Sequence, residues 1–345
     1  MNKTVNEVLD IFNNDWNKQV ILYGPPGTSK TYSSTIISAL FLAEISVTDD
    51  ENQLLDDLKK KVNIESENDS LNLYSVAKLY LEQEKERYKL VQFHPSYSYE
   101  DFVRGITVKP SDHGISYEVE PKILEKFCEE LKGNKGVLVI DEINRAPLAS
   151  VLGELIYGLE YRDHAFDTPY NKKGSYQLKI PENLYIIGTM NTADRSIGSI
   201  DYAVRRRFAF VPVLSNPDSI EDTWKNIGKD VKKLYDAMMG ENGIFKQDLC
   251  VDTEMDVEDI KIGHTYFLGD SEKANGNEKE YLKYRIKYQI VPIYNEYIKD
   301  GLIDKSGLQC LSDVLYGNIK FMFDNDDESV KEFIKNLNLP TPDAI

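Results

Sequence analysis

Lysine, threonine and glycine residues near the start of the chain form a pattern that binds nucleotide phosphates. The stretch GPPGTSKT fits the phosphate-binding loop G-x-x-x-x-G-K-[ST] at every position but one. Backbone N–H groups of such a loop cradle the phosphates, while its lysine reaches the β- and γ-phosphates and its hydroxyl ligates Mg²⁺. The predicted nucleotide-binding residues are Gly24, Pro25, Pro26, Gly27, Thr28, Ser29, Lys30 and Thr31.

The exception is Ser29, which stands where the pattern has glycine. Serine is a favoured residue at a helix N-cap, which is where this position lies. If Ser29 needed a positive φ, the strain would be on the order of 1–3 kcal/mol. Binding of a triphosphate with Mg²⁺ can absorb that cost. We therefore expect a working loop, and the alternative is a glycine-rich turn between a strand and a helix.

A second nucleotide-site pattern occurs in VLVIDEINRA, residues 137–146. Its apolar residues predict a buried strand, which would place Asp141 and Glu142 at the carboxyl end, where ligands of open α/β sheets bind. Asp141 is the predicted Mg²⁺ ligand together with Thr31. Glu142 is the predicted residue that polarises the attacking water. Alone, such a pair is an ordinary exit of the chain into solvent, but after a phosphate-binding loop it indicates a Walker B motif.

A third stretch, GTMNTADRSIGSIDYAVRRRF, covers residues 188–208. Asn191 ends another apolar run, and a neutral amide there can orient water or contact the γ-phosphate without adding charge. The run Arg205–Arg206–Arg207 is compatible with a solvated helix end. Since arginine is the residue for bidentate phosphate contacts, it is also compatible with an arginine finger that enters a neighbouring subunit's site.

The elements that must position these residues alternate between strands and helices. Strands are predicted at 18–24, within 88–106, within 135–146, within 176–191 and at 208–214, and helical spacing at 30–45, 122–132, 150–162 and 199–208 predicts helices. This alternation predicts an α/β fold with a parallel sheet flanked by helices. We expect a lead-in helix at 1–17, a nucleotide-binding core at 18–215 with an insertion at 48–88 and hairpins at 106–120 and 165–180, and a helical lid subdomain at 216–345, with a loop at 269–281.

The composition of the chain excludes several classes of protein. The chain has 345 residues, 41% of them hydrophobic, and a net charge of −17, which argues against a strong general DNA binder acting alone. The three cysteines are far apart and predict neither a zinc site nor a disulfide framework. No apolar run reaches the roughly 20 residues of a membrane helix, and the first residues do not resemble a signal peptide. We expect a cytoplasmic protein without a membrane partner.

Together the motifs resemble a known family. GPPGTSKT, QFHPSYSYEDFVRG, VIDEINRA, MNTADRS, DYAVRRRF and IGHTYF resemble the McrB family of AAA+ P-loop NTPases, the motor subunits of McrBC-type modification-dependent restriction systems. The resemblance implies a hexameric AAA+ ring with nucleotide between subunits. It also assigns Asn191 and Asp194 to a signature loop, makes Arg206 and Arg207 the candidates for a trans-acting finger, and places His264 near the nucleotide. An ordinary core histidine is the alternative for His264.

The resemblance further implies Mg²⁺-dependent hydrolysis of GTP, with ATP as the alternative, and a McrC-like nuclease partner in a restriction or antiviral defence system. Only some 17 residues precede the first strand, whereas McrB proteins usually carry an N-terminal domain that reads the modified base. We therefore expect a truncated chain, a reader on another chain that contacts DNA, or a target other than DNA. The remaining alternatives are a MoxR-like ATPase that remodels a protein partner and a nucleotide-dependent assembly scaffold.

Overall fold

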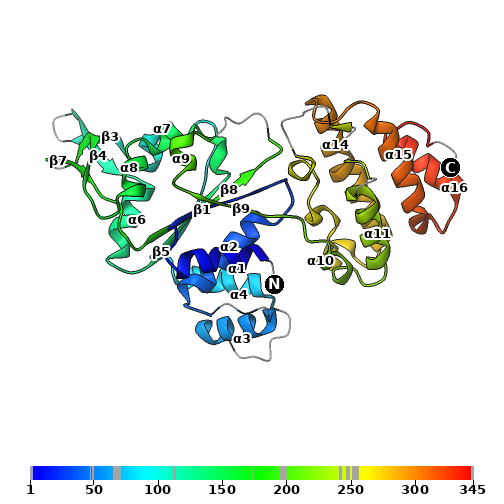
Figure 1. Ribbon diagram of the computed structural model, residues 1–345, viewed down its shortest axis with the longest axis horizontal. Helices are drawn as coiled ribbons and strands as arrows, with labels where there is room; N and C mark the ends of the chain where they lie inside the picture. Colours follow the sequence, from blue (N-terminus) through cyan, green and yellow to red (C-terminus); the bar gives the residue numbers. More distant parts are fainter. Residues whose placement is uncertain are drawn as a thin grey trace. The chain divides into compact units, whose positions relative to one another are not determined.

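The computed structural model describes residues 3–46, 48, 50–64, 71–111, 114–172, 174–194, 200–240, 243–245, 249–250 and 256–342 (Figure 1). The chain forms two compact units. Unit 1 comprises residues 1–23 and 30–212, and unit 2 comprises residues 24–29 and 213–345. None of the helices in the described part of the chain has both the length and the apolar character needed to cross a bilayer.

A five-stranded sheet forms the centre of unit 1, in the order β2-β5-β8-β1-β9. β1 pairs with β9, β2 with β5, and β5 with β8, each in parallel. The strands are β1 (Gln19–Gly24), β2 (Tyr88–Gln92), β5 (Gly136–Asp141), β8 (Leu184–Asn191) and β9 (Ala209–Pro212). The predicted α/β fold with a parallel sheet is therefore confirmed.

The sheet order places three motif strands side by side. β8 lies between β5 and β1, so the strands that lead into Asp141, Asn191 and the phosphate-binding loop are neighbours. The carboxyl ends of parallel strands meet at one edge of a sheet, where the ligands of such folds bind. The fold thus brings together residues that are more than 100 positions apart in the sequence.

Helices cover both faces of the sheet, as a parallel sheet requires. Leu138 and Ile140 of β5 pack in one core cluster with apolar residues of α6, α7 and α8, whereas α2 contacts β5 and β8 and packs with α1 and α4. Figure 1 shows α1, α2 and α4 gathered on one side of the sheet. The helices of unit 1 are α1 (Lys3–Asn13), α2 (Lys30–Leu42), α3 (Glu51–Val62), α4 (Leu73–Gln83), α5 (Tyr99–Phe102), α6 (Ile123–Leu131), η1 (Ile143–Arg145), α7 (Leu148–Leu152), α8 (Leu155–Glu160) and α9 (Tyr202–Arg205).

Two of the predicted helices are shorter than expected. The region 150–162 is divided into α7 and α8 because Gly153 has φ 49° and ψ −125°, which no helical turn accommodates. The helix expected at 199–208 is reduced to the four residues of α9, and residues 195–199 of the signature loop lie outside the described residues. Arg206 and Arg207 therefore follow the helix and do not lie within it.

Two antiparallel hairpins extend from unit 1. The first consists of β3 (Arg104–Ser111) and β4 (Gly114–Pro121), and the second of β6 (Phe166–Lys172) and β7 (Ser175–Leu178). Residues 112 and 113, where the turn of the first hairpin was expected, lie outside the described residues.

The buried side chain of Arg104 joins the bases of both hairpins. Its guanidinium makes two 2.7 Å bonds to Glu125 of α6 and donates to Thr168 and to backbone carbonyls of the second hairpin. Burial alone would raise the pKa of Glu125, but hydrogen bonds from Arg104 and Lys172 outweigh burial and lower it. A buried guanidinium with this many acceptors fixes the two hairpins to α6 as one assembly.

In the described residues of unit 2 the regular elements are helices, with one isolated β-bridge between Cys250 and Ile303. Trp224 donates from Nε1 to the Phe267 carbonyl at 2.8 Å, and Tyr294 donates to the Ile244 carbonyl at 3.0 Å, which ties distant segments to one core. The loop predicted at 269–281 contains α12, because the Asp270 side chain accepts from Lys273 N–H and caps a helical turn. Its helices are α10 (Asp218–Asp222), α11 (Gly228–Met239), η3 (Val257–Asp259), η4 (His264–Phe267), α12 (Ser271–Ala274), α13 (Glu278–Arg285), η5 (Ile286–Ile290), α14 (Val291–Lys299), α15 (Gly307–Asn318), η6 (Lys320–Phe323) and α16 (Asp327–Asn336).

Candidate nucleotide site

Asp141 receives two hydroxyl hydrogen bonds at the carboxyl end of β5. Thr31 at the start of α2 donates to its Oδ1 at 2.8 Å, and Thr189 of β8 donates to the same oxygen at 2.7 Å. The structure thus brings the end of the phosphate-binding loop next to the Walker B aspartate, as the motifs predict. Thr189 was not predicted, although it lies within the GTMN stretch, because its hydroxyl is a site group only in the folded sheet.

Glu142 is held by neighbours on two sides. Asn191 donates from Nδ2 to its Oε1 at 2.6 Å, and Arg145 donates from Nε to its Oε2 at 3.2 Å. Arg145 also approaches Asp194, with 3.5 Å between the guanidinium and the carboxylate. A chain of charged and amide groups therefore connects the Walker B glutamate to the signature loop.

The backbone of Glu142 is in the left-handed region, with φ 54°. Its N–H donates to the Thr189 hydroxyl at 3.1 Å, so the same threonine fixes both Asp141 and the turn that follows it. A non-glycine residue in this region stores strain of about 1–3 kcal/mol, and such strain collects at functional sites.

Lys30, the first residue of α2, is buried, with 7% of its surface exposed. Burial lowers the pKa of Lys30 to about 8, although the nearby carboxylates of Glu142 and Asp141 act in the opposite direction. An incoming phosphate would add the negative charge that favours the protonated amine. The lysine is thus suited to bind an anion.

Residues 24–29 of the phosphate-binding loop pack on the IGHTYF segment within unit 2. Gly263 N–H donates to the Pro26 carbonyl at 2.9 Å, and Thr265 N–H donates to the Gly27 carbonyl at 3.1 Å. A Cβ at Gly27, whose φ is 79°, would lie 2.5 Å from the Tyr266 ring. Glycine is therefore required here by both the backbone conformation and the close contact.

His264 is buried and lies next to Ser29. Its Nδ1 accepts from Asn216 N–H at 3.1 Å, so the neutral ring carries its proton on Nε2, which faces the Ser29 hydroxyl oxygen at 3.2 Å. Burial lowers the pKa of His264 to about 4, which keeps the ring neutral at physiological pH. Ser29 does have a positive φ, 68°, so the strain considered for this position is present.

The three consecutive arginines have three different environments. Arg205 stacks over Phe210, with 4.8 Å from the guanidinium carbon to the ring centre. Arg207 is 9% exposed and forms a 2.5 Å ion pair with Glu160. Arg206 is 67% exposed and lies 3.6 Å from the same carboxylate. Of the two finger candidates, only Arg206 is accessible to another chain.

Arg206 and Arg207 line a groove of about 550 Å³ in unit 1. Trp16, which is 73% exposed, and the buried Arg162 are also part of its lining. Arg162 donates to Gln19 at 2.5 Å and to the Leu159 and Leu184 carbonyls, so all of these acceptors are neutral. This groove combines an exposed aromatic ring with several guanidinium groups.

The oxygen-rich site at Asp141 fits a magnesium ion. Mg²⁺ prefers oxygen ligands and is usually bound through one or two carboxylates together with substrate phosphates. Thr31 and Asp141 supply such oxygens, and Thr189 adds a third close by. Among the residues that the structure describes, there is no group of three or more His, Cys, Asp or Glu side chains that could hold a metal without the substrate.

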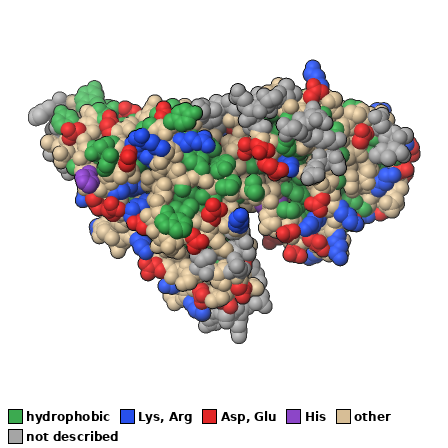
Figure 2. Space-filling model, viewed as in Figure 1, with side chains coloured by type: hydrophobic (Ala, Val, Ile, Leu, Met, Phe, Trp, Pro, Cys, Tyr) green, Lys and Arg blue, Asp and Glu red, His purple; other side chains and the backbone are tan. Residues whose placement is uncertain are grey.

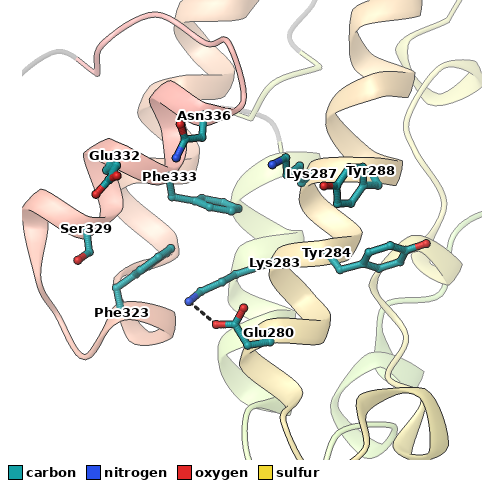
Figure 3. Close-up of a pocket in the computed structure, with 10 residues that line it drawn as sticks. All are labelled: Glu280, Lys283, Tyr284, Lys287, Tyr288, Phe323, Ser329, Glu332, Phe333 and Asn336. Carbon is teal, nitrogen blue, oxygen red and sulfur yellow. Dashed lines mark hydrogen bonds and ion pairs between the residues drawn. The ribbon is translucent and has the colours of Figure 1, made fainter.

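A groove of about 540 Å³ in unit 2 lies on helices that carry none of the predicted site residues. In Figure 3, Phe323 and Phe333 lie on one side of the groove and Lys283 projects toward them, whereas Tyr284 points away from the two rings. The Lys283 amine lies 4.1 Å from the centre of the Phe323 ring and pairs with Glu280 at 2.7 Å. The charge of Lys283 is therefore already compensated within the unit.

Comparisons with known proteins bear on the class of this protein. The family of AAA domains (dynein-related subfamily) matches residues 72–208. The EcoKMcrB subunit of the type IV methyl-directed restriction enzyme of Escherichia coli (strain K12) is 30% identical over 82% of this chain and 54% of its own length. Component YdiS of the type II restriction enzyme BsuMI of Bacillus subtilis (strain 168) is 28% identical over 51% of this chain and 56% of its own length.

Among solved structures, NtrX from Brucella abortus is 12% identical and covers 98% of this chain and 66% of its own, with a TM-score of 0.35, from which nothing further follows. This chain spans about half the length of the two restriction-enzyme relatives, 54% and 56%.

The sheet order, the adjacent motif strands and the matching domain define an AAA+ P-loop protein. Within that class the chain is McrB-like, since 82% of it matches the EcoKMcrB subunit at 30% identity.

Proposed function

We propose that this chain is the nucleoside-triphosphate-hydrolysing motor of a McrBC-like restriction system. The observation that carries the proposal is the position of Glu142, which directly follows Asp141 and whose carboxylate is held by Asn191 and Arg145. A carboxylate with this support can orient and polarise an attacking water, which is the task of a Walker B glutamate. Asn191 would hold the carboxylate in place and turn toward the water or the γ-phosphate when substrate binds.

Lys30 and Thr31 would contact the substrate's phosphates, and Gly27, Thr28 and Ser29 of the loop would supply backbone N–H groups. Mg²⁺, held by Thr31 and Asp141, would neutralise charge on the phosphates. GTP is the substrate that we favour, with ATP as the alternative. His264 would act indirectly, because its Nε2 faces the Ser29 hydroxyl and thereby fixes the conformation of the loop.

A ring of identical subunits, most simply a hexamer, follows from a finger supplied in trans. Arg206 is exposed and lies 3.6 Å from Glu160, whereas Arg207 is largely buried and paired with Glu160 at 2.5 Å. Arg206 is therefore our proposed finger, and Arg207 would hold the chain that presents it. Both relatives are named as parts of restriction enzymes, one a subunit and the other a component, which supports a separate nuclease partner through which DNA is cut.

The test is nucleotide turnover by the purified chain, measured with GTP and with ATP side by side, with and without Mg²⁺. Glu142→Gln should still bind nucleotide but lose turnover by roughly a hundredfold or more, because an amide cannot polarise water as a carboxylate does. Glu130→Gln, which changes an exposed carboxylate of α6, is the matched control and should keep normal turnover. Normal turnover in Glu142→Gln would show that the assignment is wrong, and turnover absent from the unmodified chain would favour a scaffold.

A further inference from the structure

Beyond its base, where Arg104 lies opposite Pro121, the first hairpin of unit 1 has one face made of apolar side chains. In the antiparallel register, Ile106 lies opposite Val119, Val108 opposite Tyr117, and Pro110 opposite Ile115. Residues directly opposite each other project to the same side of a two-stranded ribbon. The face is largely exposed, with 57% exposure for Ile106 and Val108, 67% for Ile115 and 73% for Tyr117. Figure 2 shows hydrophobic side chains at this end of unit 1.

The other face of the same hairpin is polar and already paired. Lys109 forms ion pairs with Glu118 at 2.9 Å and with Glu120 at 2.6 Å. Lys122 donates to the Thr107 hydroxyl at 3.2 Å. The hairpin is thus an amphipathic ribbon whose polar side is satisfied within the chain and whose apolar side is not. A contiguous exposed apolar patch of this kind marks an interaction site.

The chemistry of this apolar face indicates which kind of partner binds it. The exposed part of the apolar face carries no cation, because Arg104 at its base is buried and bound to Glu125. On the other face, Lys109 is neutralised by two carboxylates, so the ribbon lacks what phosphate binding requires. Two copies joined through this face alone would bury of the order of a few hundred Å² per chain, against about 800 Å² in a stable specific interface. A different protein that presents an apolar segment, and that contacts more than this ribbon, fits better.

We propose that the apolar face of the β3–β4 hairpin is the docking surface for the nuclease subunit, which would lay an apolar segment across it. This inference rests on the proposed function, since it names where the partner of that motor binds. The hairpin is inserted between β2 and β5, and Gln92 of β2 lies opposite Asp141 of β5. Arg104 fixes its base to α6, which leads into β5. Binding at the ribbon would therefore act on the strand that carries the Walker B residues and alter turnover.

The test uses the full chain and a purified McrC-like nuclease subunit from the same organism. Val108→Ser/Tyr117→Ser removes one opposed pair from the apolar face, and Thr107→Ser/Glu118→Ser removes the neighbouring pair from the polar face. The first variant should bind the nuclease subunit roughly tenfold to a hundredfold more weakly, as the loss of central apolar contacts does in other interfaces. It should also lose the change in turnover caused by the partner, while its basal turnover and thermal unfolding match the unmodified chain. The second variant should behave normally in all respects.

Equal binding by both variants and the unmodified chain would overturn the proposal, as would a nuclease subunit that does not bind the unmodified chain. An altered sedimentation of the first variant alone would mean that the face joins copies of this chain, and weaker binding of that variant to a DNA duplex would mean that the face contacts DNA. Either result also overturns the proposal. Basal turnover is measured separately in every case, so failure of the docking surface is distinguished from failure of the proposed motor.

Discussion

At the residue scale, two motif positions share an unusual backbone. Ser29 and Glu142 both have positive φ, 68° and 54°, and each is held there by a partner from a distant part of the sequence. His264 faces the hydroxyl of Ser29, and the Thr189 hydroxyl accepts from the N–H of Glu142. Strain persists only where the surroundings over-determine it. These partners are therefore as much a part of the candidate site as the motif residues themselves.

Replacing Ser29 separates strain from hydrogen bonding. Ser29→Gly removes the strain and also the bond to His264, so the two effects offset each other and turnover should stay within a few-fold of the unmodified chain. Ser29→Ala keeps the strain and loses the bond, so it should lower the free energy of unfolding by about 1 kcal/mol. Steady-state turnover and chemical denaturation measure the two effects. A hundredfold gain in the turnover of Ser29→Gly would show that the natural loop is impaired. It would then favour the alternative that the chain is an assembly scaffold.

The residues that could be predicted are those that a strand positions. Thr31, Asp141, Glu142 and Asn191 follow apolar runs or a loop of fixed pattern, and the structure brings them together. Arg145 could not be predicted, although it lies in the INRA stretch, because its role depends on which way one flexible side chain turns. The bond between Ser29 and His264 joins residues 235 positions apart, and no local spacing reports it.

At the element scale, the early end of α9 gives the three consecutive arginines different environments. A longer helix would have given Arg205, Arg206 and Arg207 a regular spacing around one axis. Because α9 ends at Arg205, the next two side chains leave in directions that local structure sets. Arg207 turns back to Glu160 beside α8, and Arg206 remains exposed. Sequence alone could propose a finger but could not choose between the two.

Replacing Arg206 and replacing Arg207 should therefore have different effects. Arg206→Ala should reduce turnover by about 10³–10⁵-fold, the usual value of a finger, without changing nucleotide binding or stability. Arg207→Ala should instead lower the free energy of unfolding by about 1–2 kcal/mol, because it breaks a half-buried ion pair with Glu160. Turnover, nucleotide titration and thermal unfolding of both variants distinguish these outcomes. Normal turnover in Arg206→Ala would mean that the arginine run is only a basic helix end and supplies no finger.

Mixing variants tests whether the finger acts in trans. Glu142→Gln subunits have inactive sites but keep Arg206, and Arg206→Ala subunits have intact sites but lack the finger. Mixed assemblies should regain turnover where the first kind presents its arginine to the second. If the two variants co-assemble and no turnover returns, the trans role is wrong.

At the scale of the whole molecule, the contact pattern divides the chain within the phosphate-binding loop. Residues 24–29 belong to unit 2 through the IGHTYF segment, whereas Lys30 begins α2 of unit 1. The alternation of strands and helices was enough to predict the sheet, because β1, β5 and β8 at its centre are buried apolar runs. The attachment of the loop to unit 2 was not predictable, because it depends on backbone contacts between segments more than 200 residues apart.

Nucleotide should control assembly of the chain. A ligand that contacts two chains stabilises the state in which both are present, so triphosphate with Mg²⁺ should shift the protein from small species to a ring. The net charge of −17 opposes association, and moderate salt should therefore assist it by screening the repulsion. Lys30→Ala should lose the shift because the buried amine is the group that meets the phosphates, whereas Lys135→Ala, an exposed control, should keep it. Light scattering at micromolar protein with non-hydrolysable GTP and ATP analogues measures the change, and chelation of Mg²⁺ should reverse it. A monomer that persists with both analogues at saturation would contradict the ring, and with it the trans-acting role of Arg206.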